Sequence, residues 1–279
     1  MVVLDLEKVE HSVFPGGEVH VKLEDNWKKV IVPVAIAARI TSSELLMKLL
    51  LVTDALRRAG CPSIELVMPY LPYARQDRVC NQGEALSVRV FADVINSQNY
   101  SKVHIADCHS EVGPAVLNNC VNVDNHAFVK NVIKHMQNIM ADSLSQRDIA
   151  IVSPDAGSNK KCIELMKNLG PHITLIKCDK TRDTRTGKLT GFKVNESADI
   201  SGKTCIIVDD ICDGGGTFNG LAKELQGRGV QDMYLAVTHG IFSKGFDQLH
   251  DWFTQIYTTE SFPGQRDEKL VVTLKAYEE

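Results

Sequence analysis

Two adjacent carboxylates stand beside a glycine-rich loop at residues 205–217. Asp209 and Asp210 end an apolar run, rich in β-branched residues, that predicts a buried parallel strand. The loop consists of Asp213, Gly214, Gly215, Gly216 and Thr217, and an amphipathic helix follows it. Backbone N–H groups in such a loop bind phosphate with help from the helix N-terminus. The carboxylates suit sugar hydroxyls or a metal ion instead, so the pattern favours a phosphorylated-sugar site over a strand-to-helix turn with solvated acids.

A loop at residues 69–78 offers groups that could bind a nucleotide. It directly follows a predicted strand, and Pro69 and Pro72 exclude a helix. Arg75 and Gln76 lie in it, and a guanidinium binds phosphate through its forked donors. A solvated surface loop is the alternative that the chemistry alone leaves open.

Two further strands are followed by polar side chains. Asp107 and His109 come after the strand expected at residues 103–106, and Asp155 comes after the one expected at 149–153. A lone histidine is more often structural than functional, but here a carboxylate stands two residues away. Because ligands of open α/β sheets bind at the carboxyl ends of strands, these side chains are candidates for ligand contacts.

The stretch at residues 178–188 alternates in charge and predicts a mobile loop. Lys180 and Arg182 lie in its first half. A closing lid can deliver cations to a transition state and exclude water, so mobility is compatible with catalysis. Near the N-terminus, Phe14 offers a stacking face and Glu18 an acceptor, although the intervening Pro-Gly-Gly by itself favours a hairpin turn.

With these motifs, nearly the whole chain resembles the ribose-phosphate diphosphokinase (phosphoribosyl diphosphate synthetase) family. Residues 69–78 are almost a decapeptide of that family, and residues 208–217 resemble its phosphoribosyl-diphosphate-binding loop. The resemblance implies an α/β fold of two phosphoribosyltransferase-type, Rossmann-like domains with the active site between them. It also implies Mg²⁺-dependent transfer of the β,γ-diphosphate of ATP to the 1-hydroxyl of ribose 5-phosphate. The products would be AMP and phosphoribosyl diphosphate, a precursor for nucleotide biosynthesis.

The resemblance also assigns roles to individual residues. Lys180 and Arg182 match lid cations that stabilise the transferring group. His109 matches a contact of the metal–ATP unit, and Asp155 matches an acid that helps to hold magnesium. The implied ATP-binding set is Phe14, Glu18, Arg75, Gln76 and His109, and the implied ribose- and phosphate-binding set is Asp209, Asp210, Asp213, Gly214, Gly215, Gly216 and Thr217.

Three positions depart from the family pattern. Gly16 stands in place of an aspartate that contacts adenine, and Thr181 in place of the middle arginine of the lid motif. Gly214 replaces a threonine whose hydroxyl binds the 5-phosphate of ribose 5-phosphate. Its small size is expected to leave space for a longer 5-substituent, so ADP-ribose is the alternative acceptor for the same chemistry.

Two other function classes share part of the pattern. A phosphoribosyltransferase would use the loop after Asp209 but would have no use for Arg75 and Gln76. A non-catalytic regulatory relative is the third possibility, and the retention of Lys180 and Arg182 argues against it.

These motifs need strands that end at one edge of a sheet, and the chain alternates strand and helix patterns that build parallel sheets. Strands are expected at residues 30–34, 64–68, 103–106, 149–153, 174–178, 204–208 and 233–238, and helices at residues 87–95, 128–140 and 163–169. An earlier helix is expected to open with a capping box at residues 41–44 and to end before Gly60.

Two α/β domains, at residues 1–141 and 142–279, fit the alternation better than one long sheet. The boundary is placed at the polar segment 141–148. A chain of 279 residues with 44% hydrophobic content can form both cores. A net charge of −4 gives no indication of a basic face, so nucleic acid is not expected as a partner.

The eight cysteines show neither a zinc spacing nor a Cys-x-x-Cys pair, which favours a reducing, cytoplasmic location. The N-terminal residues lack the pattern of a signal peptide, and no apolar stretch has the length of a membrane span. The family resemblance implies a homo-oligomer, built from dimers and possibly a hexamer, in which Phe14 and Glu18 reach the ATP of a neighbouring subunit.

Overall fold

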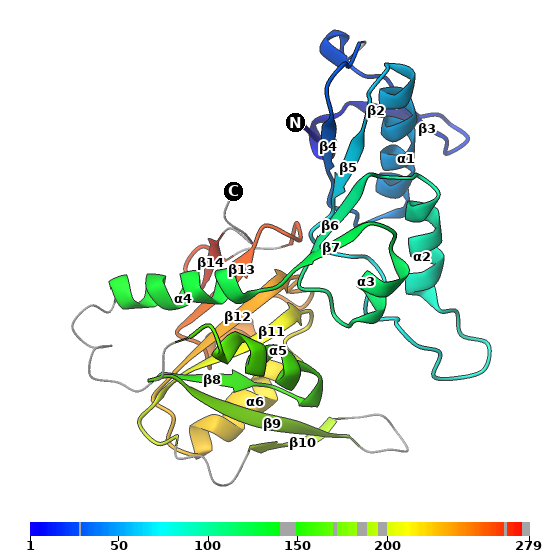
Figure 1. Cartoon of the computed structure of the whole chain (residues 1–279). Helices are drawn as coiled ribbons and strands as arrows, with labels where there is room; N and C mark the ends of the chain where they lie inside the picture. Colours follow the sequence, from blue (N-terminus) through cyan, green and yellow to red (C-terminus); the bar gives the residue numbers. More distant parts are fainter. Residues whose placement is uncertain are drawn as a thin grey trace. The chain divides into compact units, whose positions relative to one another are not determined.

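The chain forms two compact units, Met1–Asp124 and Asn125–Glu279 (Figure 1). The computed structural model describes residues 1–27, 29–139, 149–169, 172–182, 189–194, 200–264 and 267–274, with the backbone alone at residues 181, 182, 189 and 190. Within these residues, no helix combines the length and the apolar character needed to cross a membrane.

The first unit is a five-stranded parallel sheet in the order β1-β4-β5-β6-β7. Its strands are β1 (Val2–Asp5), β4 (Val34–Ala37), β5 (Ile64–Val67), β6 (Lys102–Ala106) and β7 (Cys120–Val123). Its helices are α1 (Ser43–Arg58), α2 (Ser87–Asn96) and α3 (Val112–Val116), with 3-10 turns at Leu6–Lys8 and Asp25–Trp27. A separate antiparallel hairpin joins β2 (His11–Val13) to β3 (Val19–Val21).

The second unit is a seven-stranded sheet in the order β10-β9-β8-β11-β12-β13-β14, parallel except for the β9–β10 pair. Its strands are β8 (Ile149–Ser153), β9 (Thr174–Arg182), β10 (Leu189–Val194), β11 (Thr204–Cys212), β12 (Asp232–Gly240), β13 (Gln255–Thr259) and β14 (Val271–Leu274). Its helices are α4 (His126–Ile139), α5 (Ala156–Met166), α6 (Gly216–Gly227) and α7 (Asp247–His250). Both sheets thus confirm the predicted α/β class.

Side-chain alternation along β11 builds a core on each face of the second sheet. Cys205 and Ile207 are buried on the face that α6 covers, with Leu221 of that helix in the same cluster. Ile206 and Val208 are buried on the opposite face, among apolar residues of α4 and α5. Because successive strand residues point to opposite faces, helices can cover both sides of the sheet, as Figure 1 shows.

The division between the units falls before α4. Phe128 and Val132 of this helix share a buried cluster with Ile151 and Tyr257 of the second sheet. The boundary expected between residues 141 and 142 lies outside the described residues. Helix α4, which that boundary assigns to the first domain, is grouped with the second unit because its apolar face packs there.

Two local expectations near the N-terminus were wrong. The strand expected at residues 30–34 begins only at Val34, and Ile31 is 77% exposed. Pro33 has no N–H to give to a ladder, so pairing starts after it, with Val34 N donating to Ser63 O at 3.0 Å. The cap of α1 is Ser42 rather than Thr41, because the Ser42 hydroxyl accepts from Leu45 N.

Three elements of the second unit are longer than expected. Helix α5 starts at Ala156, ahead of the expected residue 163, and strand β11 continues past residue 208 to Cys212. Strand β9 extends through Lys180 to Arg182, because β10 pairs with it in antiparallel fashion. Residues 178–182 are therefore strand, and the expectation that they begin a loop was wrong.

Candidate active site

The order of strands in the second sheet defines where a ligand is expected to bind. From β8, the chain passes to β9 on one side and then returns to β11 on the other side. Ligands of open α/β sheets bind at the carboxyl ends of strands, where the order reverses in this way. Asp155 directly follows β8, and Asp209 and Asp210 lie near the end of β11. The sheet therefore brings together carboxylates that are far apart in the sequence.

The pairing of β11 leaves these two aspartates beyond one of its neighbours. On the β8 side the ladder ends at Ile207, whereas on the β12 side it continues to Cys212. Asp209 and Asp210, expected at the strand end, thus belong to β11 itself, and they lie beyond the last residue that β11 pairs with β8.

Lys180 and Asp155 form an ion pair at this edge. Lys180 Nζ lies 2.6 Å from Asp155 Oδ2, with the two side chains 16% and 28% exposed. The other oxygen, Asp155 Oδ1, accepts from Ser158 N at 3.0 Å and caps α5. Although burial opposes it, the bonds from Lys180 and Ser158 hold the pKa of the Asp155 carboxyl below its usual value.

The pKa of Asp209 is shifted in the direction opposite to that of Asp155. Burial, together with the carboxylates of Asp210 and Asp155, raises the pKa of Asp209 well above its usual value, and Lys180 opposes this only in part. The backbone N–H of Asp210 donates to Asp209 Oδ1 at 3.0 Å, which holds the Asp209 side chain against the backbone of its neighbour. Asp155 and Asp209, at the same edge of the sheet, are therefore carboxyls in unlike environments.

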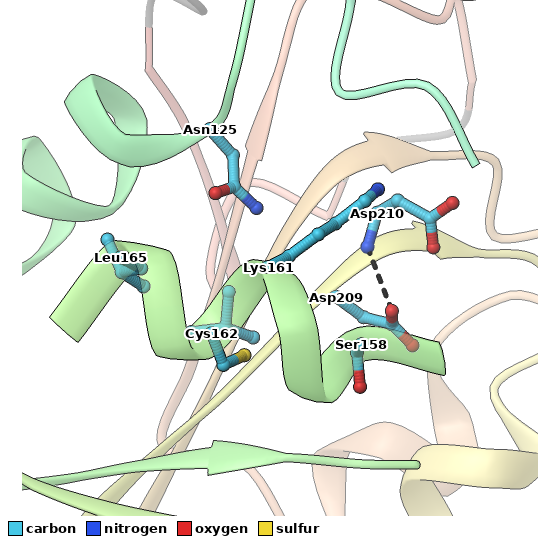
Figure 2. A pocket seen from close by; sticks show the side chains of 8 residues that line it. Asn125, Ser158, Lys161, Cys162, Leu165, Asp209 and Asp210 are labelled. Atoms are coloured by element: carbon cyan, nitrogen blue, oxygen red, sulfur yellow. Dashed lines mark hydrogen bonds between the residues drawn. The ribbon is translucent and has the colours of Figure 1, made fainter. Parts of the chain in front are cut away.

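A water-sized cavity of about 10 Å³ lies behind the aspartates, between α5 and β11. Its lining is Asn125, Ser158, Lys161, Cys162, Leu165, Val208, Asp209 and Asp210. Figure 2 shows Lys161 reaching from α5 toward Asp210. A second lysine thus accompanies the acid pair.

The glycine loop forms the start of α6. Gly215 has φ of 73° and occupies the N-cap position, where a left-handed backbone favours glycine. The helix begins at Gly216, so Thr217 belongs to its first turn rather than to the loop before it. The N–H groups of this turn point out of the helix end, as an anion site requires.

Two residues near this loop were missed by sequence reasoning. Ser243 Oγ donates to Asp213 Oδ1 at 2.6 Å, and Lys244 packs against Gly214. Both follow β12, the neighbour of β11, so polar residues after that apolar strand were the available signal. The space expected beside Gly214 adjoins the Lys244 side chain: a Cβ added at Gly214 would lie 3.2 Å from Lys244 Cδ.

The proposed lid is described only at its base. Lys180 pairs with Phe192, and Arg182 with Leu189, across the β9–β10 ladder. Residues 183–188 lie outside the described residues, and so does the side chain of Arg182. Lys180 is therefore the lid residue whose side chain the structure describes, and it lies at the site.

In the first unit, residues 69–78 form a loop that buried side chains anchor. Leu71 and Ala74 pack in the core, whereas Arg75 and Gln76 are exposed. Tyr73 has φ of 62°, an uncommon backbone conformation for a residue with a Cβ. Such strain is often found at functional sites, and here it accompanies the turn that presents the arginine.

Arg75, Gln76 and His109 line one cavity of about 480 Å³. The remaining lining is Asp77, Arg78, Cys80, Glu84, Ala85 and Ser87. The buried Asp77 joins the two loops that form this wall, since its carboxyl bonds to Arg78 Nε at 3.0 Å and to the Ser110 side chain. Although burial opposes it, these bonds lower the pKa of Asp77. The predicted ATP-binding residues of strands β5 and β6 are thus brought together.

Phe14 and Glu18 do not line this cavity. They sit on the turn of the β2–β3 hairpin, where Phe14 N donates to Glu18 O at 2.9 Å and Gly17 has φ of 86°. The Phe14 ring is 51% exposed and lies 5.6 Å from the His20 ring, centroid to centroid. The hairpin interpretation is confirmed, and it leaves an aromatic face open to solvent.

Carboxylate oxygens are the donors that Mg²⁺ prefers, and the second unit supplies them at Asp155, Asp209 and Asp210. Both oxygens of Asp155 already accept hydrogen bonds, so a metal would share Oδ2 with Lys180 or displace it. Among the described residues, no three His, Cys, Asp or Glu side chains are arranged as a ready metal site. The donor chemistry fits magnesium with few protein ligands.

Two family models match this chain. The model of the N-terminal domain of ribose phosphate pyrophosphokinase matches residues 2–98, and the phosphoribosyl transferase domain model matches residues 122–264. The first match lies within the first compact unit, and the second begins at residue 122, close to the division after Asp124.

Named relatives agree with these matches. The ribose-phosphate pyrophosphokinase of Mycoplasma pneumoniae is 28% identical over 84% of this chain and 68% of its own length. That of Bradyrhizobium diazoefficiens is 29% identical over 87% of this chain and 73% of its own. The crystal structure of phosphoribosylpyrophosphate synthetase from Mycobacterium smegmatis superposes with a TM-score of 0.77 at 26% identity, over 95% of this chain and 85% of the other.

Proposed function

Because this chain belongs to the ribose-phosphate pyrophosphokinase family of transferase enzymes, we propose that it transfers the β,γ-diphosphate of ATP to ribose 5-phosphate. The observation that carries the proposal is the cluster of Lys180, Asp155, Asp209 and Asp210 at the reversal of strand order. The cluster supports the proposal because it combines a cation with carboxylates that suit sugar hydroxyls, on strands next to the α6 turn, whose N–H groups suit a phosphate.

In the reaction, the 1-hydroxyl oxygen of the ribose attacks the β-phosphorus of ATP. The bond from that phosphorus to the oxygen shared with the α-phosphate breaks, AMP leaves with that oxygen, and the hydroxyl proton passes to solvent. Asp209 and Asp210 orient the 2- and 3-hydroxyls, and the turn from Asp213 to Thr217 holds the 5-phosphate. Lys180 and Arg182 neutralise charge on the transferring group, as phosphoryl transfer requires.

The first unit binds ATP in the cavity of about 480 Å³. Arg75 and Arg78 face the phosphates as forked donors, and Gln76 contributes an amide. His109 would contact the metal-bound triphosphate, and Asp155 is the carboxylate of the second unit that would help to hold Mg²⁺. When bound, Mg²⁺ would neutralise phosphate charge and orient the triphosphate.

The other function classes use less of this geometry. A phosphoribosyltransferase needs the α6 turn but has no role for the arginine-lined cavity of the first unit. A non-catalytic relative would not need the Lys180–Asp155 ion pair at the acceptor carboxylates.

The absence of any disulfide among the eight cysteines, all within the described residues, accords with the reducing cytoplasm as the place of action.

We expect AMP release from Mg²⁺-ATP to depend on ribose 5-phosphate. A competition with equimolar ADP-ribose, with products resolved by mass, identifies the acceptor. Gly214 is the observation that favours ADP-ribose as the second candidate, because it lacks the hydroxyl that the family uses for a 5-phosphate. Phosphoribosyl diphosphate as the sole product excludes ADP-ribose, whereas diphosphorylated ADP-ribose as the main product overturns the first choice. Transfer of a phosphoribosyl group from phosphoribosyl diphosphate to a nucleobase, in the absence of ATP, would contradict both diphosphokinase candidates.

The open Phe14 ring supports a shared site in a homo-oligomer. If Phe14 serves the ATP of a neighbouring subunit, two inactive variants should complement each other. We expect Phe14→Ala and Lys180→Ala to be poorly active alone and to regain activity when their subunits are mixed and exchanged, because a mixed pair contains one site with both residues. Light scattering measures the assembly in parallel. Failure of exchanged mixtures to regain activity would exclude the shared site.

A further inference from the structure

We propose that Lys244 binds the phosphoryl group on the 5-oxygen of the ribose acceptor and takes the place of the hydroxyl that Gly214 lacks. The inference rests on the proposed function. Its starting point is a close approach: a Cβ built on Gly214 would lie 3.5, 3.2 and 3.3 Å from Lys244 Cγ, Cδ and Cε. The Lys244 stem therefore runs along the position that a larger residue's side chain would take.

Hydrogen bonds hold the Lys244 segment against the phosphate-binding loop. Ile241 N and Phe242 N both donate to Cys212 O, at 2.9 and 3.1 Å. Ser243 N donates to Asp213 O at 3.1 Å, and its hydroxyl donates to the Asp213 carboxylate at 2.6 Å. These contacts fix the backbone directly before Lys244, so its position beside Gly214 follows from a paired segment and not from a loosely placed side chain.

The ammonium of Lys244 is available to a ligand. The residue is exposed, and no ion pair or hydrogen bond joins its side chain to the described residues. The nearby Asp213 carboxylate is instead engaged by Ser243. Nζ is bonded to Cε, so it lies within reach of any group cradled by the N–H donors of the α6 turn. A lysine ammonium there binds a phosphate as a point charge.

Gly214 and Lys244 are therefore complementary. A threonine at residue 214 would bring a hydroxyl to the phosphate but would crowd the lysine stem. Glycine removes the hydroxyl and admits the lysine, whose cation restores a donor at the same place. The chemistry recognised is a phosphoryl ester on O5, which ribose 5-phosphate and ADP-ribose share.

The test uses Lys244→Met, which keeps most of the aliphatic stem but removes the charge. It is compared with Lys244→Arg, which keeps the charge, and with the control Lys223→Met on the exposed side of α6. We expect Lys244→Met to raise the acceptor KM by about ten-fold or more, equivalent to about 1.4 kcal/mol. The kcat and the KM for ATP should change by no more than about two-fold, because the contact persists in ground and transition states. Lys244→Arg and Lys223→Met should stay close to the parent enzyme.

A second variant tests the exchange of roles. In Lys244→Ala the acceptor KM should rise. Adding Gly214→Thr to this variant should recover most of the lost affinity, because the threonine hydroxyl can then bind the phosphoryl group and no lysine stem crowds it. Gly214→Thr in the parent should weaken acceptor binding. An acceptor KM of Lys244→Met within about two-fold of the parent, or no recovery in the double variant, overturns the proposal.

Each acceptor is assayed separately, so the results also identify the source of the phosphoryl group. If the parent enzyme converts neither acceptor, the proposed function fails. Calorimetric titration with ribose 5-phosphate and with ADP-ribose then tests whether Lys244 contributes to binding the phosphoryl group. Binding to the parent that is at least about ten-fold weaker in Lys244→Met supports the lysine's role. Equal binding, or none to the parent, refutes it.

Discussion

Lys180→Ala is expected to lower turnover by about 10³-fold, the effect of removing a cation from a phosphoryl-transfer transition state. The KM for ATP should remain within about two-fold, because this charge acts chiefly as the transferring group becomes more negative. Lys180 lies on β9, and its Nζ is 2.6 Å from Asp155 Oδ2, beside the carboxylates proposed to bind the acceptor. Steady-state rates of AMP formation measure the effect.

Lys177→Ala is the matched control for this prediction. Lys177 lies on the same strand and is exposed, and it projects from the other face because side chains alternate along a strand. Its turnover should match that of the parent. Arg182→Ala should also cut turnover by orders of magnitude, since it matches the second lid cation. If Lys180→Ala and Arg182→Ala both turned over within a few-fold of the parent, the catalytic assignment would be wrong.

Asp209→Asn is expected to stabilise the protein and to impair it as an enzyme. Burial and the neighbouring carboxylates of Asp210 and Asp155 raise the pKa of Asp209, so its ionisation costs stability in the folded state. Asparagine has nearly the same shape and no charge to bury. Turnover should fall by about ten-fold or more, because a hydrogen bond from a sugar hydroxyl to a carboxylate contributes about 1.5–3 kcal/mol.

The pH dependence of this gain has a definite sign. A carboxyl whose pKa is raised on folding stabilises the fold at low pH and loses that contribution as pH rises through the folded pKa. The difference in Tm between Asp209→Asn and the parent should therefore be near zero below about pH 4, where the unfolded carboxyl is also protonated. It should then grow toward pH 8.

Thermal melts in chelator-containing buffer measure this difference without bound metal. Asp251→Asn is the control, an exposed aspartate at the end of α7, and it should show no such pH dependence. A parent that melted above Asp209→Asn at pH 8 would contradict the electrostatic account of the pair.

The sequence by itself determined the class of fold and indicated the loops that are proposed to carry the chemistry. Strand and helix patterns depend on local periodicity, so the alternation, the parallel sheets and helix α2 could be read directly. The same holds for Arg75, Gln76 and His109, which were placed at strand ends and do line one cavity. Their side chains converge because β5 and β6 are neighbours in a parallel sheet.

Only the tertiary structure decided how the second site is built. Lys180 looked like part of a loop because the strand that extends β9 is supplied by β10, whose pairing no local pattern reveals. Asp155 both caps a helix and pairs with Lys180, and Lys244 contacts Gly214 from the segment that follows β12. These contacts join residues that are distant in the chain, and their energies depend on burial and on facing partners. Propensity acts within a few residues, so it could identify the groups but not which of them meet.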